Sequence, residues 1–288
     1  MSEASAKTSI GPIALIAVEQ NYPDGQRVIT DRLANHMLPL GSKILVRLLK
    51  PSWMREWIIG LSDRSQPGIW GGLLCRKCYI DDKLTASAKD IEAVVNLGAG
   101  FDTRNFRLAS LSETSIWEID QPGNIETKET RLRNALGTIP GNVKLVPIDF
   151  DSEDLASALT SRGYSTGKPT FFIMEAVTQY LTPKGIEEVF SFLSNATKGS
   201  LLAFTYVRKD FFDGKTLYGW GSGYKRFVKG GIWQSAFDPE ALSGFLLNYG
   251  WRIIEDRGYD DLADEYLKPS GRKLGSTPVE RIVYAEKI

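Results

Sequence analysis

Apolar positions change their spacing along this chain, and the changes predict two kinds of element. Short β-branched and aromatic runs typical of buried strands recur at Ala93–Leu97, Ser115–Ile119, Val143–Ile148, Thr170–Met174, Ser200–Tyr206, Arg252–Asp256 and Arg281–Ala285. Apolar residues at helical spacing lie between most of these runs, as in Ser152–Ser161, Lys184–Asn195 and Pro239–Tyr249. This alternation predicts an α/β fold with a central, mostly parallel seven-stranded sheet and helices on both faces.

The first 89 residues follow a different pattern. Apolar residues occur at helical spacing, with Pro and Gly between the segments, in Ile29–Leu38, Lys43–Leu49 and Trp53–Leu61. We therefore expect residues 1–89 to form a helical cap or lid on a core of residues 90–288. Within that core, residues 206–237 interleave aromatic side chains with glycines, which predicts an insert that covers a substrate.

A glycine turn follows the first predicted strand. Gly98 and Gly100 interrupt the apolar run, and helical spacing resumes beyond them, which is typical of a nucleotide-binding corner. Thr103 stands where a dinucleotide fold has its third glycine, and Asp102 would repel a pyrophosphate by roughly 1 to 4 kcal/mol. An NAD-dependent oxidoreductase is therefore the disfavoured alternative. Asp102 suits a cationic ligand such as S-adenosylmethionine, or it caps the helix, which is compatible with either ligand.

Acidic residues end three successive strands of the predicted sheet. Asp120 follows the glycine turn by about twenty residues, the spacing at which a carboxylate binds ribose hydroxyls. Asp149 and Phe150 pair an acceptor with an aromatic ring, as an adenine site requires, and Glu175 ends the fourth strand. Ligands of open α/β sheets bind outside these carboxyl ends, so the acids form a candidate nucleoside site; the alternative is solvated loop acids.

Composition argues against several classes of function. Lys and Arg total 35, as do Asp and Glu, so the chain lacks the basic excess of a nucleic-acid-binding protein. No apolar run is long enough to cross a membrane, and Gly11–Val18 lacks the flanks of a signal peptide. We expect a cytoplasmic protein that binds neither nucleic acid nor membrane.

The cysteines do not predict a metal site. Cys75 and Cys78 are one helical turn apart, but zinc takes about four ligands and His36 is the single histidine of the chain. We expect no metal, and we interpret His36 as an ordinary helix-face residue rather than a catalytic one.

Three motifs together are more specific than the glycine turn alone. The segments Leu97–Arg104, Glu118–Pro122 and Glu175–Leu181 resemble the leucine carboxyl methyltransferase family of class I S-adenosylmethionine-dependent methyltransferases, whose fold is Rossmann-like. The resemblance runs from about Arg76 to Leu181 and returns weakly at Leu267–Ala285. It implies an O-methyltransferase, of the kind found in secondary metabolism or of the kind that methylates a protein's C-terminal leucine.

The resemblance also implies a role for each matching position. Arg76 would pair with the methionine carboxylate of S-adenosylmethionine, Gly98 and Gly100 would approach its methionine portion, and Glu175 would lie near its amine. Asp120 would bind the ribose, and Asp149 and Phe150 would bind the adenine. Ile16–Glu19 departs from the Arg-Ala-x-Glu of many small-molecule members, which puts a cofactor or lid role there in doubt.

The acceptor is predicted less closely. A carboxylate is ionised at neutral pH and needs no general base, whereas a phenol or enol of high pKa would want one, and the sequence offers no evident base. We therefore expect methyl transfer to a carboxylate or an acidic enol or phenol of a small metabolite, by proximity and orientation. Protein C-terminal carboxyl methylation is the alternative, and oligomeric state stays open. Candidate acceptor-binding side chains are Tyr206, Arg208, Tyr218, Trp220 and Tyr224.

Overall fold

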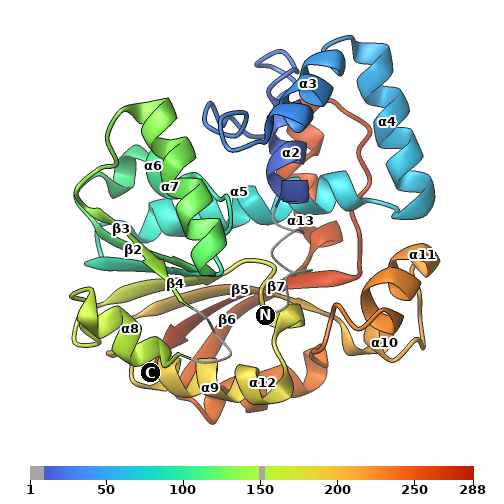
Figure 1. The fold of residues 1–288 in the computed structure, drawn as a ribbon. Coiled ribbons are helices and arrows are strands. Elements are labelled where there is room, and N and C mark those ends of the chain that lie inside the picture. Colours follow the sequence, from blue (N-terminus) through green and yellow to red (C-terminus); the bar gives the residue numbers. More distant parts are fainter. Residues whose placement is uncertain (1–9, 149–152) are drawn as a thin grey trace.

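A computed structural model describes residues 10–148 and 153–288 of the chain. Within them, seven strands form one sheet in the order β3-β2-β1-β4-β5-β7-β6 (Figure 1). All neighbours are parallel except β7, which runs antiparallel to both β5 and β6. The predicted fold class is confirmed, and the connections reverse direction between β1 and β4, where such sheets bind ligands.

Each predicted strand is present within a few residues of its expected ends. The bounds are β1 Ala93–Leu97, β2 Ser115–Asp120, β3 Val143–Pro147, β4 Thr170–Met174, β5 Leu201–Val207, β6 Trp251–Gly258 and β7 Glu280–Lys287. Every residue of β1 and β4 is buried, because helices cover both faces of these central strands. This explains why their sequences are continuous apolar runs rather than alternating ones.

Helices form a layer on each face of the sheet (Figure 1). Their bounds are α2 Ile10–Glu19, α3 Leu40–Leu48, α4 Ser52–Ser65, α5 Ile69–Ser87, α6 Arg104–Arg107, α7 Pro122–Leu136, α8 Leu155–Ser161, α9 Pro183–Ser194, α10 Lys209–Phe212, α11 Gly221–Gly223, α12 Pro239–Leu247 and α13 Tyr259–Tyr266. Alternate strand residues divide between the layers: Val94 packs towards α5 and α13, whereas Val95 packs towards α9 and α12.

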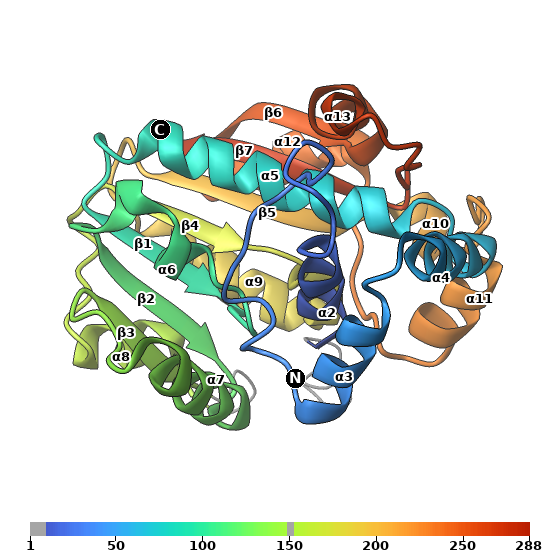
Figure 2. The same ribbon diagram turned by 90° about the horizontal axis from the view of Figure 1, so that it is seen from above.

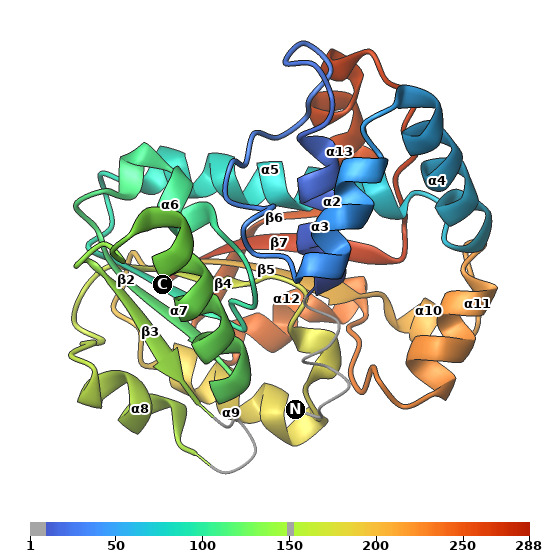
Figure 3. The same ribbon diagram turned by 45° about the horizontal axis from the view of Figure 1, so that its top comes forward.

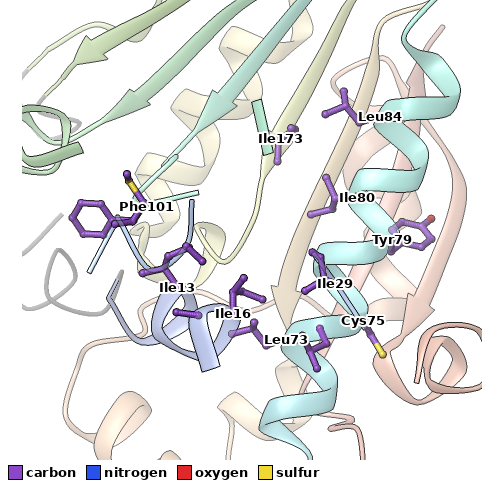
Figure 4. Packing of buried hydrophobic residues seen from close by; sticks show 14 of the residues in the cluster. Ile13, Ile16, Ile29, Leu73, Cys75, Tyr79, Ile80, Leu84, Phe101 and Ile173 are labelled. Atoms are coloured by element: carbon purple, nitrogen blue, oxygen red, sulfur yellow. The ribbon is translucent and has the colours of Figure 1, made fainter. Parts of the chain in front are cut away.

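The N-terminal segment packs directly on the sheet. Helix α5 crosses one face of the sheet beside α13, and α2 lies beyond the carboxyl ends of the parallel strands (Figures 2 and 3). Figure 4 shows Ile13 and Ile16 of α2 close to Phe101 of the glycine turn, in the hydrophobic cluster that also holds Ile173 of β4. The proposed boundary at residue 89 stays a prediction, and apolar packing is continuous across it.

One helical prediction in this segment is wrong. Residues 31–38 form successive turns rather than the helix expected over Ile29–Leu38. The side chain of Asp31 accepts hydrogen bonds from the backbone N–H groups of Leu33 and Ala34, as an N-cap residue does. The backbone beyond it closes mostly through bonds between residues three apart, such as the His36 N–H to the Leu33 carbonyl at 2.8 Å, which form turns rather than a continuous α-helix.

An ion pair is completely buried between the sheet and helix α7. Lys128 Nζ lies 2.7 Å from Glu118 Oε2, and neither side chain is exposed. Asn105 donates a hydrogen bond to the other oxygen of Glu118. Because both charges have lost their water, each depends on the other to remain inside the protein.

We predict that Lys128→Met lowers the free energy of unfolding by about 3 to 5 kcal/mol, because Glu118 then stays buried without its cation. Urea denaturation at neutral pH measures the change. Lys184→Met, which removes an exposed pair with Glu188, is the control and should change stability little.

The pH dependence of this loss gives a second readout. Burial raises the pKa of Glu118 even with Lys128 beside it, so the folded chain binds a proton more readily than the unfolded chain. Removing Lys128 raises that pKa further, and stability then increases as pH falls. The difference in the free energy of unfolding between Lys128→Met and the wild type should therefore become smaller as the pH falls from about 7 to about 5. A constant difference would contradict this explanation.

Candidate functional site

The glycine turn lies at the carboxyl end of β1, where the strand order reverses. Gly98 and Gly100 both have positive φ angles, of 68° and 45°, which favour glycine. A Cβ atom at Gly98 would stand 2.4 Å from a methyl carbon of Val177. The turn therefore requires glycine at residue 98 for its conformation and for the close approach of the loop after β4.

A small cavity of about 100 Å³ lies against this turn, and we call it the glycine-turn cavity. It brings together Arg76, Gly98, Gly100, Asp120 and Glu175, five of the seven residues predicted to bind the cofactor. Asp149 and Phe150 lie outside the described residues. The lining also contains residues that were not predicted: Pro12, Ile13, Lys77, Asn96, Asn124, Ala176, Val177 and Tyr180.

Asp120 is buried and its carboxylate is held in a fixed position. One oxygen accepts a hydrogen bond from the Gly100 backbone N–H at 2.6 Å. The other accepts from the Gln121 N–H and from Asn124 Nδ2, each at 2.7 Å. A carboxylate has about four acceptor positions, so these three bonds leave room for a further donor from the cavity.

Charged side chains form a connected group beside the turn, which we call the ion network. Its members are Asp31, Arg76, Lys77, Asp81, Asp102, Arg104, Arg107, Glu175 and Glu280. The network contains four cations and five carboxylates, and the side chains are almost wholly buried. Such a group is stable because every buried charge has a partner.

Glu175 has three ion-pair partners within this network, as many as Arg104. It pairs with Arg76 at 2.9 Å, with Lys77 at 3.0 Å and with Arg104. Burial acts to raise the pKa of Glu175, but Lys77, Arg104 and Arg76 together hold it below its ordinary value. The carboxylate is thus ionised across the neutral range, although its side chain is only 8% exposed.

Asp102 does not provide the uncompensated negative charge that the sequence suggested. Arg104 Nε lies 2.6 Å from one of its oxygens and Lys77 Nζ lies 3.2 Å from the other. Burial acts to raise the pKa of Asp102, but Arg104 and Lys77 hold it well below its ordinary value. Asp102 also accepts a hydrogen bond from the backbone N–H of Arg104 at the start of α6, but the N-cap residue of this helix is Thr103, so the capping alternative is not confirmed.

A second, larger cavity of about 550 Å³ adjoins the first, and we call it the aromatic cavity. Its walls include Leu15, Ile69, Leu73, Gln179, Trp220, Arg226, Phe227, Ile232, Trp233, Tyr259, Thr277 and Glu280. Both cavities are lined by Pro12, Arg76, Ala176 and Tyr180. A ligand in one cavity can therefore meet a ligand in the other at this shared boundary.

The aromatic cavity contains one of the five predicted acceptor-binding residues, Trp220. Tyr206 points to the opposite face of the sheet, where its hydroxyl donates to Asp256 at 2.8 Å. Arg208 and Tyr218 both bind Asp210, with the arginine at 2.9 Å.

Tyr224 is also absent from the cavity lining, because its ring packs edge-on against Phe211 at 5.7 Å. The arrangement therefore gives no support to an acceptor role for Tyr206, Arg208, Tyr218 or Tyr224.

Several residues of the aromatic cavity belong to segments that the sequence analysis identifies, although it does not name these residues individually as site residues. Gln179 and Tyr180 belong to the motif that begins at Glu175, and Glu280 belongs to the C-terminal part of the resemblance. Trp233 lies in the aromatic insert. Their side chains meet only through the tertiary fold, so spacing along the chain carries no signal for the pairing.

Two other sequence features have structural roles. Glu19 is fully buried and pairs with Arg272 at 2.6 Å, which joins α2 to the segment before β7. Cys75 and Cys78 are free, and burial raises the pKa of Cys75 to about 12, so its thiol is unreactive. Among the described residues there is no metal-binding cluster of His, Cys, Asp or Glu. No helix found in residues 10–148 and 153–288 is long and apolar enough to span a membrane.

The sequence resembles named methyltransferases. It is 30% identical over 221 residues to the Bacillus subtilis protein YktD, covering 74% of this chain and 69% of YktD. It is 32% identical over 207 residues to a Mycobacterium marinum protein, covering 70% of this chain and 63% of that one. Both relatives are named as S-adenosyl-L-methionine-dependent methyltransferases.

The fold and the family model agree with this similarity. A Thermobifida fusca crystal structure, titled as that of a methyltransferase, has a TM-score of 0.59 at 16% identity and covers 89% of this chain and 93% of its own. Residues 9–194 match the model of the leucine carboxyl methyltransferase family. The chain therefore belongs to the leucine carboxyl methyltransferase family of S-adenosylmethionine-dependent methyltransferases.

Proposed function

We propose that the protein transfers the methyl group of S-adenosylmethionine to an oxygen atom of a small molecule, either a carboxylate or an acidic enol or phenol. The observation that carries this proposal is the pair of adjoining cavities. Arg76, Ala176 and Tyr180 line both of them, so a cofactor in the glycine-turn cavity would meet an acceptor in the aromatic cavity. Orienting the two reactants in this way supplies much of the rate enhancement of such a transfer.

The residues of the glycine-turn cavity suit this cofactor. Asp120 keeps acceptor capacity for ribose hydroxyls, Arg76 suits a carboxylate, and Glu175 suits an ammonium group. When bound, the cofactor supplies a methyl group already activated by its sulfonium. The cavity, at about 100 Å³, is smaller than typical ligand sites of roughly 300 to 1,000 Å³. Arg76 and Glu175 would therefore exchange part of their mutual ion pair for bonds to the ligand.

Two observations disfavour a dinucleotide. The backbone N–H of Arg104 at the start of α6 already donates to Asp102, so it is not available to a pyrophosphate. Helix α6 is only four residues long and provides little dipole.

The size and the aromatic lining of the second cavity favour a small molecule over a protein terminus. Trp220, Phe227 and Trp233 line a space of about 550 Å³, within the usual range for small-molecule sites. Methyl transfer from radiolabelled S-adenosylmethionine to panels of small acids, phenols and enols, and to peptides ending in leucine, tests this choice. If only the peptides were labelled, the small-molecule proposal would be wrong and protein carboxyl methylation would replace it.

We predict that Asp120→Asn weakens S-adenosylhomocysteine binding at least about tenfold, because the amide exchanges an acceptor of ribose hydroxyls for a donor. Calorimetric titration measures the affinity, and the melting temperature reports whether the variant is folded. Asp238→Asn, at the start of α12 and outside both cavities, is the matched control. Unchanged affinity in a folded Asp120→Asn protein would exclude the ribose assignment.

We predict that Arg76→Lys weakens S-adenosylhomocysteine binding at least about tenfold but leaves 5′-methylthioadenosine binding nearly unchanged. The second ligand lacks the amino-acid carboxylate that the guanidinium would hold. Lysine keeps the positive charge between Glu175 and Glu280, which limits the loss of stability.

Arg107→Lys is the control for this change, because Arg107 belongs to the same network but lines neither cavity. It should affect both ligands alike. An equal loss for both ligands in Arg76→Lys would count against a carboxylate contact and point to a general disturbance of the site.

A further inference from the structure

Helices α3 and α4 expose apolar side chains that a folded chain ordinarily buries. Seven of the twelve large apolar side chains that are exposed in the described residues lie within residues 40–61. Single exposed apolar residues are normal, but such a concentration marks a surface that contacts another phase or another molecule. We call it the apolar surface, and its members are Leu40, Ile44, Leu45, Leu48, Trp53, Trp57 and Leu61.

The exposure follows the helical repeat. Residues four apart lie on one side of a helix. Exposed residues recur at this spacing from Leu40 to Leu48 on α3 and from Trp53 to Leu61 on α4. The exposed fraction is 75% for Leu40, 71% for Trp53 and 65% for Trp57, so these side chains protrude into the solvent. Each helix therefore directs an apolar stripe away from the protein.

The buried side of α4 fixes this orientation. Arg55 is buried although it is charged, and its guanidinium donates to the carbonyl oxygens of Leu49 and Lys50 at the end of α3. The same group lies 4.2 Å from the centre of the Tyr22 ring. Ile59, one helical turn after Arg55, is buried as well. A charge thus lies inside while two tryptophans lie outside, the reverse of the usual pattern for a surface helix.

Both helices are attached to segments that line the aromatic cavity. They lie on the outer side of the N-terminal segment (Figures 1 and 3). Asn21, which follows α2, donates to the Val46 carbonyl of α3 at 2.8 Å. The hydroxyl of Ser222, in the aromatic insert, donates to the Ser65 carbonyl at the end of α4, also at 2.8 Å. The apolar surface is therefore held in place by contacts with the rest of the fold.

Cations accompany the apolar surface. Residues 32–55 contain no Asp or Glu, and among them Arg32, Lys43, Arg47 and Lys50 are exposed or half-buried. The zero net charge of the whole chain predicts no membrane contact, but it averages over this local excess of cations. Leu and Trp side chains beside Lys and Arg are typical of helices that lie in the interface of a membrane.

We propose that α3 and α4 bind the surface of a membrane that contains anionic phospholipids. The helices are 9 and 14 residues long, so they would lie in the plane of the membrane rather than cross it. Trp53 and Trp57 would enter the interfacial layer, and Arg47 and Lys50 would contact lipid phosphates. This inference is independent of the proposed function, because no residue of the apolar surface lines either cavity.

A second copy of the chain fits this surface less well. In a twofold dimer the same surface of each chain meets its own copy. Arg47 and Lys50 would then face the same cations again, and residues 32–55 provide no carboxylate to pair with them. Anionic lipid headgroups supply the missing charge, and a fluid layer accommodates protruding side chains.

Co-sedimentation of the full chain with lipid vesicles tests the proposal. Vesicles of phosphatidylcholine with about 30% phosphatidylserine are compared with vesicles of phosphatidylcholine alone. We expect at least about tenfold tighter binding to the anionic vesicles, and this binding should weaken as the salt concentration rises. Absence of binding to the anionic vesicles, or equal binding to both kinds, would overturn the proposal.

The double variant Trp53→Gln with Trp57→Gln removes part of the apolar surface. It should weaken binding to the anionic vesicles at least about tenfold, because two side chains can no longer enter the lipid. Both are exposed, so the melting temperature should change little. Leu247→Gln with Ile254→Gln, at two exposed apolar positions elsewhere, is the matched control and should bind as the wild type does. Wild-type binding by the tryptophan variant would show that the proposal is wrong.

The double variant Arg47→Gln with Lys50→Gln tests the contribution of charge. It should weaken binding to the anionic vesicles at least about tenfold and leave the weaker binding to phosphatidylcholine unchanged. Lys184→Gln with Lys198→Gln, at exposed positions outside α3 and α4, is the control. An equal loss on both kinds of vesicle would contradict a contact between these cations and anionic lipid.

Light scattering on the free protein distinguishes a membrane from a second copy. A monomer leaves the apolar surface available to lipid, as the proposal requires. A wild-type dimer that the tryptophan double variant converts to a monomer would assign the apolar surface to contact between two chains and overturn the proposal. Binding of S-adenosylhomocysteine, measured separately by calorimetry, tests the proposed function whatever the vesicles show.

Discussion

The rest of the structure depends on the pairing of buried charges around Glu175. The ion network joins four parts of the fold that are far apart in sequence: helix α5, the glycine turn, the end of β4 and the start of β7. Removing one partner from a buried pair costs about 3 to 5 kcal/mol, a large share of the stability of a typical domain. The position of α5 across the sheet and the geometry of the site are therefore set by the same contacts.

The ion network also restricts what can bind beside it, because its five carboxylates already outnumber its four cations. A net anion would add to this excess of negative charge, and a simple cation would compete with Lys77 and Arg104 for Glu175. The amino-acid end of S-adenosylmethionine carries a carboxylate and an ammonium together. It can divide the Arg76–Glu175 pair and give each member a new partner, with no change in the charge balance of these groups. This exchange is also consistent with the small volume of the glycine-turn cavity.

Sequence patterns predicted the sheet well because burial on both faces requires continuous apolar runs, as in β1 and β4. They predicted Gly98, Gly100 and Asp120 as cavity residues because the ends of parallel strands meet at one edge. They were wrong about the charge of Asp102, because its cations come from elsewhere in the fold or from Arg104, which a strand pattern does not orient. Tyr206 lies away from the aromatic cavity because of strand parity, since alternate side chains of a strand face opposite sides of the sheet.

The two cavities differ in how freely their chemistry can change. The glycine-turn cavity takes its charged lining from the ion network and from Asp120, where a substitution would disturb the fold as well as the ligand. Much of the aromatic wall comes from residues 206–237, whose apolar side chains form a separate cluster and to which no ion-network residue belongs. A replacement at Trp233 or Phe227 can thus change the aromatic cavity while the contacts of the ion network remain intact. In the proposed function, the charged cavity holds the methyl donor and the aromatic cavity holds the acceptor, and both are lined by Arg76.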